Sequence, residues 1–167
     1  MNKLFTAIKQ IEKKEYWYLL LFIVICQIAG LLGSLATLSS VDTWYASLVK
    51  PSLTPPGWVF GPIWTILYTL MGIATWLVWR TKSTLKKEAL ITFFIHLAFN
   101  ALWSFLFFGL QSTTYGLAGI LFLFLLILIT IRVYEKVSIV AALLLIPYAF
   151  WVFFATYLSF GLLWLNR

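Results

Sequence analysis

Long apolar runs separated by short polar stretches make up most of this chain. Five runs are long enough to cross a hydrocarbon core of about 30 Å, which takes roughly 20 residues of helix. The period-two alternation of a membrane β-barrel is missing from them, and lipid cannot satisfy the polar groups of an open strand edge. The pattern predicts an all-α integral membrane protein, a five transmembrane helix bundle. The expected spans are residues 17–38, 58–79, 89–108, 115–133 and 137–165.

The fifth span is long and carries Pro147 in its interior. A proline inside a helix removes one backbone hydrogen bond and clashes with the preceding turn, at a cost of about 3 kcal/mol. We therefore expect the fifth span to be kinked or weakened at Pro147.

Composition supports lipid as the solvent for much of the chain. Of the 167 residues, 63% are hydrophobic and 10% are charged, and the mean hydropathy is +0.99. A soluble domain of this size could not cover so much apolar surface. The single cysteine, Cys26, lies in an apolar run, which leaves neither a disulfide framework nor a cysteine-based metal site.

The distribution of basic residues predicts the orientation of the bundle. Ten lysines and arginines fall in the amino-terminal segment and in the second and fourth connections, whereas Lys50 and Arg167 fall on the other side. By the positive-inside rule, the amino terminus is expected in the cytoplasm and the proline-rich first connection outside. Topology and contact with anionic membrane lipid then account for the net charge of +7, and nucleic acid is not needed as a partner.

Residues 1–16 form a charged amino-terminal tail before the predicted membrane domain of residues 17–167. Apolar residues at positions 4, 5, 8 and 11 would share one helical face. A short interfacial helix and a solvated charged tail are both open interpretations. The tail leads into a full-length span rather than a small-residue cleavage site, so we expect an uncleaved first helix.

Conventional catalytic and transport motifs are missing from the sequence. No carboxylate is expected at the middle of the membrane, where it could relay protons or bind a coupling cation, because all five acids lie in the tail or near connections. Neither a glycine-rich nucleotide loop nor a cluster of His, Cys and carboxylates with metal spacing occurs. We therefore expect no metal site and no required cofactor.

Polar and aromatic residues within the spans line up on helix faces. Residues three, four or seven positions apart share one face of a helix. The rows are His96, Asn100 and Trp103 in the third span, Trp64 and Tyr68 in the second, and Tyr148, Trp151 and Ala155 in the fifth.

Asn100 and His96 are expected to face the bundle interior, because their exposure to hydrocarbon would be costly. Each is either a binding residue or interhelical hydrogen-bonding glue, and glue is the favoured interpretation for His96. Trp64 and Trp151 lie deeper than the tryptophans expected in the interfacial belts. Their depth indicates either the wall of a pocket or a packed core.

Three separated segments together resemble a known family. They are "WYASLVKPSLTPPGWVFGPIWTILYTLMGIA", "LAFNALWSFLFFGL" and "LLLIPYAFWVFFATYLSF". In this order they look like the successive signatures of the translocator protein family, also called tryptophan-rich sensory protein (TspO/MBR). The resemblance covers all five spans. It implies a five-helix bundle, commonly a homodimer, that binds porphyrins such as protoporphyrin IX or haem and other flat apolar ligands.

The resemblance also implies a ligand pocket that opens toward the first long connection. Carried over position by position, it includes Tyr45, Pro55, Trp64, Asn100, Trp151 and Ala155, and the helix faces add Tyr68, His96, Trp103 and Tyr148. Prolines restrict the connection, so it can act as a pre-formed lid over the bundle. Aromatic faces would stack on a tetrapyrrole, while Asn100 would offer a hydrogen bond.

The chain departs from the family pattern at several positions. His96 stands where the family usually has Gln, and Ser159 where it usually has Asn. Phe160 occupies the tyrosine position of the consensus proposed for cholesterol, and Arg167 is too far from Tyr157 to complete that consensus. These departures favour a bacterial-type porphyrin binder in a bacterial cell membrane over a sterol role.

Three functions remain open at this point. The leading one is a membrane receptor or sensor for porphyrins. The second is a tetrapyrrole or sterol transporter, for which the sequence shows neither inverted repeats nor paired broken helices. The third, which the resemblance suggests, is an enzyme that degrades porphyrin with light and oxygen. Trp64 and Trp151 would then be its catalytic residues.

The segment "AGLLGSLA" at residues 29–36 spaces small residues four positions apart. Ala29 pairs with Gly33, and Gly30 pairs with Ser34, so a second helix could approach closely on this face. We expect a homodimer, although the same residues could equally serve packing within a single bundle.

Overall fold

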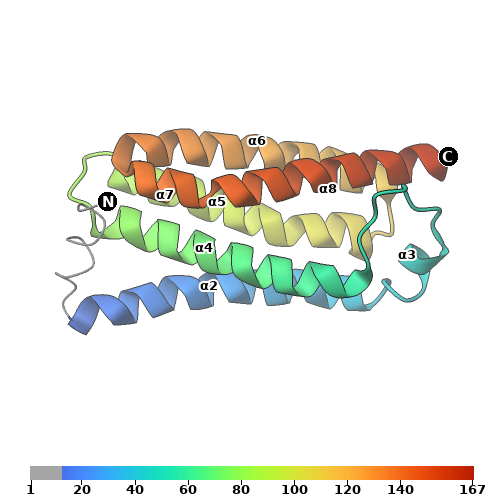
Figure 1. The fold of residues 1–167 in the computed structure, drawn as a ribbon, viewed down its shortest axis with the longest axis horizontal. Coiled ribbons are helices and arrows are strands. Elements are labelled where there is room, and N and C mark those ends of the chain that lie inside the picture. Colours follow the sequence, from blue (N-terminus) through green and yellow to red (C-terminus); the bar gives the residue numbers. More distant parts are fainter. Residues whose placement is uncertain (1–12) are drawn as a thin grey trace.

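The computed structural model describes residues 13–167, and these residues form a bundle of long helices (Figure 1). The elements, in chain order, are α2 (Lys13–Leu38), α3 (Trp44–Ser47), η1 (Gly57–Val59), α4 (Phe60–Arg80), α5 (Lys86–Ser104), η2 (Phe105–Gly109), α6 (Thr113–Val137), α7 (Ile139–Leu144) and α8 (Ile146–Leu165).

Five helical segments are long and apolar enough to cross a membrane. They are Glu15–Leu38, Gly57–Arg80, Lys86–Gly109, Thr113–Val137 and Ile139–Leu165. These segments confirm the five-helix, all-α membrane fold predicted from the apolar runs. Helix α2 begins at Lys13 rather than at Trp17, so the proposed boundary after residue 16 falls inside this helix. The suggested interfacial helix lies outside the described residues.

The fifth span is interrupted at the position that the sequence predicts. Helix α7 ends at Leu144 and α8 begins at Ile146. The N–H of Leu145, between them, donates to the carbonyl of Ala142 at 3.1 Å, three residues back rather than four. Pro147 lies in the first turn of α8, where its missing N–H is tolerated. The interruption confirms the expected effect of this proline.

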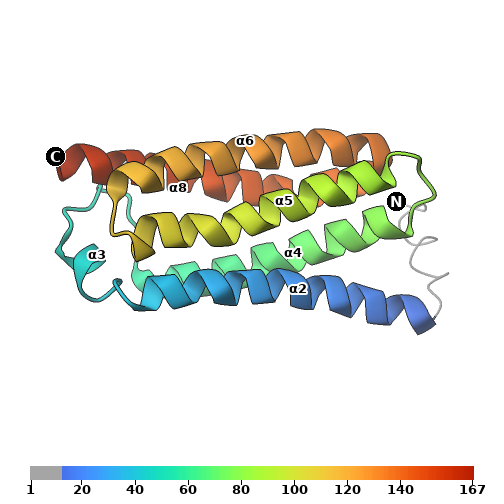
Figure 2. The same ribbon diagram turned by 180° about the vertical axis from the view of Figure 1, so that it is seen from behind.

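The helices pack as a closed ring. Helix α2 packs against α4 and α5, α6 packs against α5 and α8, and α4 packs against α7. Figure 2 shows α2, α5 and α6 from the opposite side. Toward the end that carries α3 and the carboxyl terminus, the axes of α4 and α8 diverge (Figure 1). The backbones of α4 and α8 therefore lie further apart toward this end.

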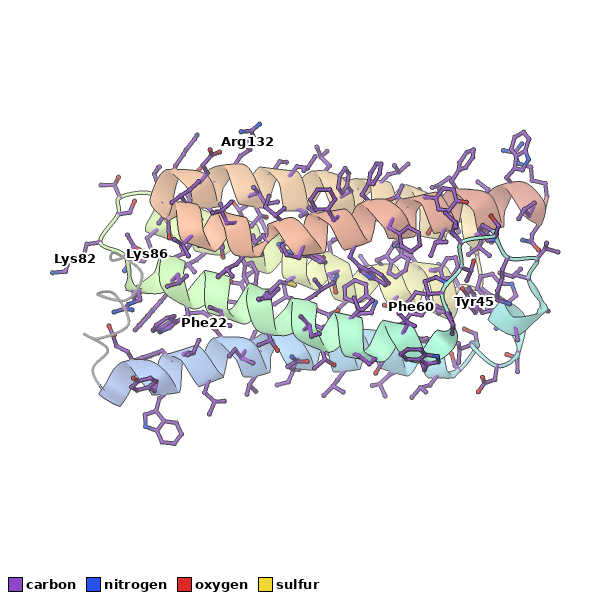
Figure 3. The ribbon with its side chains drawn as sticks, viewed as in Figure 1. Phe22, Tyr45, Phe60, Lys82, Lys86 and Arg132 are labelled. Atoms are coloured by element: carbon purple, nitrogen blue, oxygen red, sulfur yellow. The ribbon has the colours of Figure 1, made fainter. Side chains whose placement is uncertain are left out.

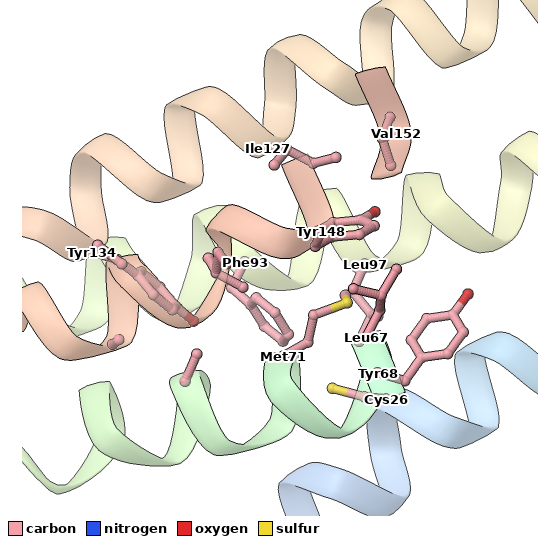
Figure 4. Packing of buried hydrophobic residues seen from close by; sticks show 14 of the residues in the cluster. Cys26, Leu67, Tyr68, Met71, Phe93, Leu97, Ile127, Tyr134, Tyr148 and Val152 are labelled. Atoms are coloured by element: carbon pink, nitrogen blue, oxygen red, sulfur yellow. The ribbon is translucent and has the colours of Figure 1, made fainter. Parts of the chain in front are cut away.

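Figure 4 shows the apolar interior of the bundle. Met71, Phe93, Ile127 and Tyr134 are fully buried there and come from α4, α5 and α6. Gly72 lets α4 approach α2, because a Cβ at this position would lie 2.6 Å from the Cα of Ile23. Many leucine, isoleucine and phenylalanine side chains on the outside are exposed, which is the distribution expected when lipid is the solvent.

The glycines of the small-residue segment in α2 face other helices of the same bundle. A Cβ on Gly30 would collide with the ring of Tyr68 in α4, and one on Gly33 would lie 2.9 Å from the Oγ of Ser104 in α5. The structure therefore uses these glycines for packing within one bundle, the alternative that the sequence left open. The homodimer stays a prediction.

The charged residues concentrate at one end of the bundle. That end contains Arg80, the α4–α5 connection and the end of α6, and Figure 3 labels Lys82, Lys86 and Arg132 there. Lys50 and Arg167 belong to the opposite end, together with α3. The structure thus groups the described basic residues as the sequence predicts. Which end faces the cytoplasm stays a prediction.

Candidate ligand-binding site

Aromatic side chains of α4 and α8 meet where the two helices diverge. Trp64 meets Tyr148 edge-on, with ring centroids 6.1 Å apart, and Phe60 meets Trp151 edge-on at 5.8 Å. Trp64 also stacks on Tyr68 at 5.4 Å. We call these five residues the aromatic cluster. Four of them were predicted as site residues from the sequence: Trp64 contacts Tyr68 and Tyr148, whereas Trp151 contacts Phe60.

Asn100 joins the two sides of the aromatic cluster from α5. Its Oδ1 accepts a hydrogen bond from the hydroxyl of Tyr68 at 2.5 Å, and its Nδ2 donates to the hydroxyl of Tyr148 at 2.7 Å. The Asn100 residue is only 2% exposed. A buried amide with both ends bonded rigidifies its surroundings. Asn100 therefore positions the two tyrosines, and its second side-chain N–H has no bond to another described residue.

His96 is fully buried one turn before Asn100. Its ring stacks on Tyr148 with centroids 5.5 Å apart and meets Phe93 edge-on at 5.3 Å. The Nδ1 atom lies 3.4 Å from the Oγ1 of Thr130, while Nε2 is buried without a partner among the described residues. Because Tyr148 and Phe93 cover the ring, these contacts favour a structural role for His96, as the sequence interpretation does.

Trp151 contributes an unsatisfied donor to the aromatic cluster. Its Nε1 is buried and has no hydrogen-bond partner among the described residues. Buried polar groups are nearly always paired, and an unpaired donor costs about 1–3 kcal/mol. An acceptor group on a ligand that reached this indole would remove that cost.

The first long connection is fastened to the carboxyl-terminal end of α8. Asn166 Oδ1 accepts from the N–H of Val49 at 2.9 Å, and Asn166 Nδ2 donates to the carbonyl of Val49, also at 2.9 Å. Pro51 packs against Gly161, where a Cβ would lie 2.6 Å from the proline Cγ. We call the paired bonds between Val49 and Asn166 the loop clamp. The clamp and the buried Pro51 hold the connection against α8, as the predicted lid requires.

Tyr45 lies in α3, at the same end of the bundle as Phe60 (Figure 3). Its ring meets Phe107 and Phe108 edge-on at 6.1 and 5.6 Å, and the Nζ of Lys50 lies 5.0 Å from its centroid. Partial burial raises the pKa of the Tyr45 hydroxyl, so the group stays neutral at physiological pH. It is therefore an uncharged hydroxyl beside a cation.

Three other predicted site residues lie in different surroundings. Trp103 stacks on Phe107 at 5.7 Å, and its Nε1 donates to the carbonyl of Gly116 at 2.9 Å. It thus packs between α5 and α6, where the structure does not place it in the aromatic cluster. Ala155 is half-buried and packs against the apolar core. Pro55 is half-buried in the first connection.

The sequence interpretation missed Phe60, Gln27 and Asn166. Phe60 lies four residues before Trp64, on the same helix face, which is a usable signal. Gln27 is a polar residue inside an apolar run, and its Nε2 donates to the carbonyl of Thr65 and to the Oγ1 of Thr69 in α4 at 3.0 and 3.1 Å. Nothing local marks Asn166, whose partner lies 117 positions away.

Two grooves lie on the outer surface of the bundle. One, of about 650 Å³, runs between α6 and the α7–α8 span, and the other, of about 480 Å³, lies at the α4–α5 connection. None of the predicted site residues lines either groove.

Comparisons with known proteins agree with this architecture. A family described as TspO/MBR matches residues 22–165. The chain is 45% identical over 137 residues to the "Tryptophan-rich protein TspO" of Archaeoglobus fulgidus, across 82% of this chain and 89% of that protein. It is 42% identical over 155 residues to the protein of the same name from Chlorobaculum tepidum, across 92% and 98%. It is also 34% identical over 142 residues to the "Translocator protein" of Bos taurus, across 83% and 84%. With its five apolar helices, this chain therefore belongs to the TspO/MBR family of multi-pass integral membrane proteins.

Proposed function

We propose that this protein is a membrane receptor or sensor that binds a flat tetrapyrrole, such as protoporphyrin IX or haem, at the aromatic cluster between α4 and α8. The observation that carries the proposal is the cluster itself: Phe60 of α4 meets Trp151 of α8, and Trp64 of α4 meets Tyr148 of α8, where the two helices diverge. The buried indole N–H of Trp151 has no hydrogen-bond partner among the described residues. Aromatic faces stack well on a planar ring system. The unpaired N–H gives such a ligand a polar contact.

Polar groups at the end with α3 suit the carboxylates of a porphyrin. Lys50 is exposed there and belongs to the connection that the loop clamp fastens to α8. A porphyrin could keep its apolar ring among the aromatic side chains and its propionates near this cation and the headgroup region. Membrane lipid is thus the surrounding solvent in this proposal. The basic end of the bundle is proposed to face the cytoplasm of a bacterial cell.

The test is a titration of the purified protein with protoporphyrin IX, followed by the absorbance of the porphyrin. Trp64→Phe and Trp151→Phe each remove part of an aromatic surface worth about 0.5–1.5 kcal/mol, which corresponds to roughly 2- to 10-fold weaker binding. Asn100→Ala releases Tyr68 and Tyr148, so a loss of similar size is expected. Trp164→Phe is the matched control, because Trp164 is exposed near the end of α8.

If the three site variants bind protoporphyrin IX as tightly as the Trp164→Phe control, the proposed site is refuted. Two further measurements separate the other family activities from binding alone. Flux of the porphyrin into proteoliposomes would show transport. Loss of the porphyrin spectrum under light and oxygen, prevented by Trp64→Phe or Trp151→Phe, would show degradation.

A further inference from the structure

The smaller surface groove has a basic mouth and an apolar floor. We call it the α4–α5 groove. Its mouth is formed by Ser83, Thr84 and Lys87, and its floor by Leu90, Ile91 and Phe94 on one face of α5. Ile91 and Phe94 are exposed and belong to the membrane-spanning segment Lys86–Gly109. The groove therefore runs from the charged end of the bundle into the region that lipid surrounds.

One wall of the α4–α5 groove is held rigidly. Trp79 lines the groove, and its ring stacks on Tyr18 of α2 with centroids 4.2 Å apart. Lys86 donates from Nζ to the carbonyl of Trp79 at 2.7 Å. These contacts fix the indole and tie the end of α4 to the start of α5.

The positive charge at the mouth is not compensated within the described residues. Arg80 is paired with Glu15 at 3.0 Å, whereas no ion pair of Lys82 or Lys87 is found among residues 13–167. Glu88, the single acid of α5, does not line the groove. An anion at the mouth would therefore meet Lys87, which has no carboxylate partner among residues 13–167.

We infer that the α4–α5 groove binds one anionic phospholipid. The phosphate would lie at Lys87 with the hydroxyls of Ser83 and Thr84, and one acyl chain would lie along Ile91 and Phe94. The distance along α5 from Lys86 to Phe94 is eight residues, or about 12 Å, so the groove accommodates a headgroup and the first part of a chain. Charge complementarity at the mouth selects an anionic headgroup over a zwitterionic one.

The experiment measures lipid binding to the purified full-length protein in detergent by native mass spectrometry. Phosphatidylglycerol is compared with phosphatidylcholine of the same chains, with dihexanoyl phosphatidylglycerol and with inorganic phosphate. We expect long-chain phosphatidylglycerol to bind more tightly than each of the other three. Lys87→Gln should weaken its binding about 5-fold, the value of one lysine at an anionic lipid surface. Lys87→Arg should retain binding.

Lys136→Gln is the matched control, because Lys136 is exposed in the last turn of α6, at the same end of the bundle but outside this groove. Its effect should stay below 2-fold. Equal losses in Lys87→Gln and Lys136→Gln would overturn the inference in favour of diffuse attraction. Equal binding of phosphatidylcholine, or binding of inorganic phosphate as strong as that of the lipid, would overturn it as well.

Discussion

Gly30 in α2 controls the position of Tyr68, although it belongs to neither helix that carries the aromatic cluster. A Cβ at residue 30 would lie 2.8 Å from the Cδ2 of Tyr68 and still closer to Cε2. Real Cβ atoms do not approach other heavy atoms so closely. In Gly30→Ala the Tyr68 ring must therefore move, and its hydroxyl bond to Asn100 is strained or lost.

The expected magnitude follows from three contributions. Over-packing costs about 1–3 kcal/mol, and loss of the Tyr68–Asn100 hydrogen bond costs about 0.5–1.5 kcal/mol. Replacing glycine by alanine in a helix raises the free energy of unfolding by about 1 kcal/mol, because alanine has the higher helix propensity. We therefore expect Gly30→Ala to lower the free energy of unfolding by roughly 2 kcal/mol, measured by denaturation in mixed micelles and followed by circular dichroism.

Gly61→Ala is the matched control, because Gly61 lies in the first turn of α4 and a Cβ there meets no atom within 4 Å outside its own chain neighbours and helix backbone. Its stability should be unchanged or slightly raised. Combining Gly30→Ala with Tyr68→Ala should make the double variant more stable than the two separate losses add up to, since the ring that obstructs the new methyl is gone. A Gly30→Ala protein as stable as Gly61→Ala, or additive losses in the double variant, would refute the reasoning.

Three further predictions follow from other contacts. Gly72→Ala should destabilise the protein more than Gly30→Ala in the same denaturation assay, because its Cβ would meet the backbone of Ile23, which cannot rotate away. Asn166→Ala should increase hydrogen exchange of the Val49 amide roughly 2- to 10-fold, whereas Asn166→Asp, which keeps the acceptor, should preserve its protection; equal exchange in both variants would contradict the loop clamp. His96→Gln should leave the spectrum of bound haem unchanged, because Tyr148 and Phe93 cover the His96 ring; loss of a six-coordinate spectrum would show that His96 ligates iron.

The five helices could be predicted from the sequence because each apolar run must satisfy its backbone internally in lipid. The burial of Asn100 and His96 follows from the same cost of exposing polar groups to hydrocarbon. The partners of Asn100 could not be predicted, because periodicity gives the face of a helix and not its neighbour. Tyr68 and Tyr148 bond to Asn100 only because α4 and α8 both pass α5 at this level.

Trp103 is a second residue whose helix face, but not whose neighbour, could be predicted from periodicity. It shares a face of α5 with Asn100, whose side chain bonds to tyrosines of α4 and α8, but the indole of Trp103 donates to the carbonyl of Gly116 in α6. Gly116 and Gly119 of α6 leave room for aromatic rings there, since a Cβ on Gly116 would collide with the ring of Phe107 and one on Gly119 would lie 3.1 Å from the Cδ1 of Trp103. This pair of glycines was the available signal. These glycines could have predicted the position of Trp103 only if α6 had been known to face this part of α5.

The contacts around the aromatic cluster indicate where a ligand would enter in the proposed function. Among the described residues, no hydrogen bond joins α4 directly to α8; Asn100 links them through the hydroxyls of Tyr68 and Tyr148. Phe60 and Trp151 meet edge-on across the two helices, with ring centroids 5.8 Å apart. A planar ligand entering there replaces one aromatic contact by another and breaks no hydrogen bond between these helices. The hydrogen bonds of Asn100 and the loop clamp can therefore persist while α4 and α8 move apart at Trp151.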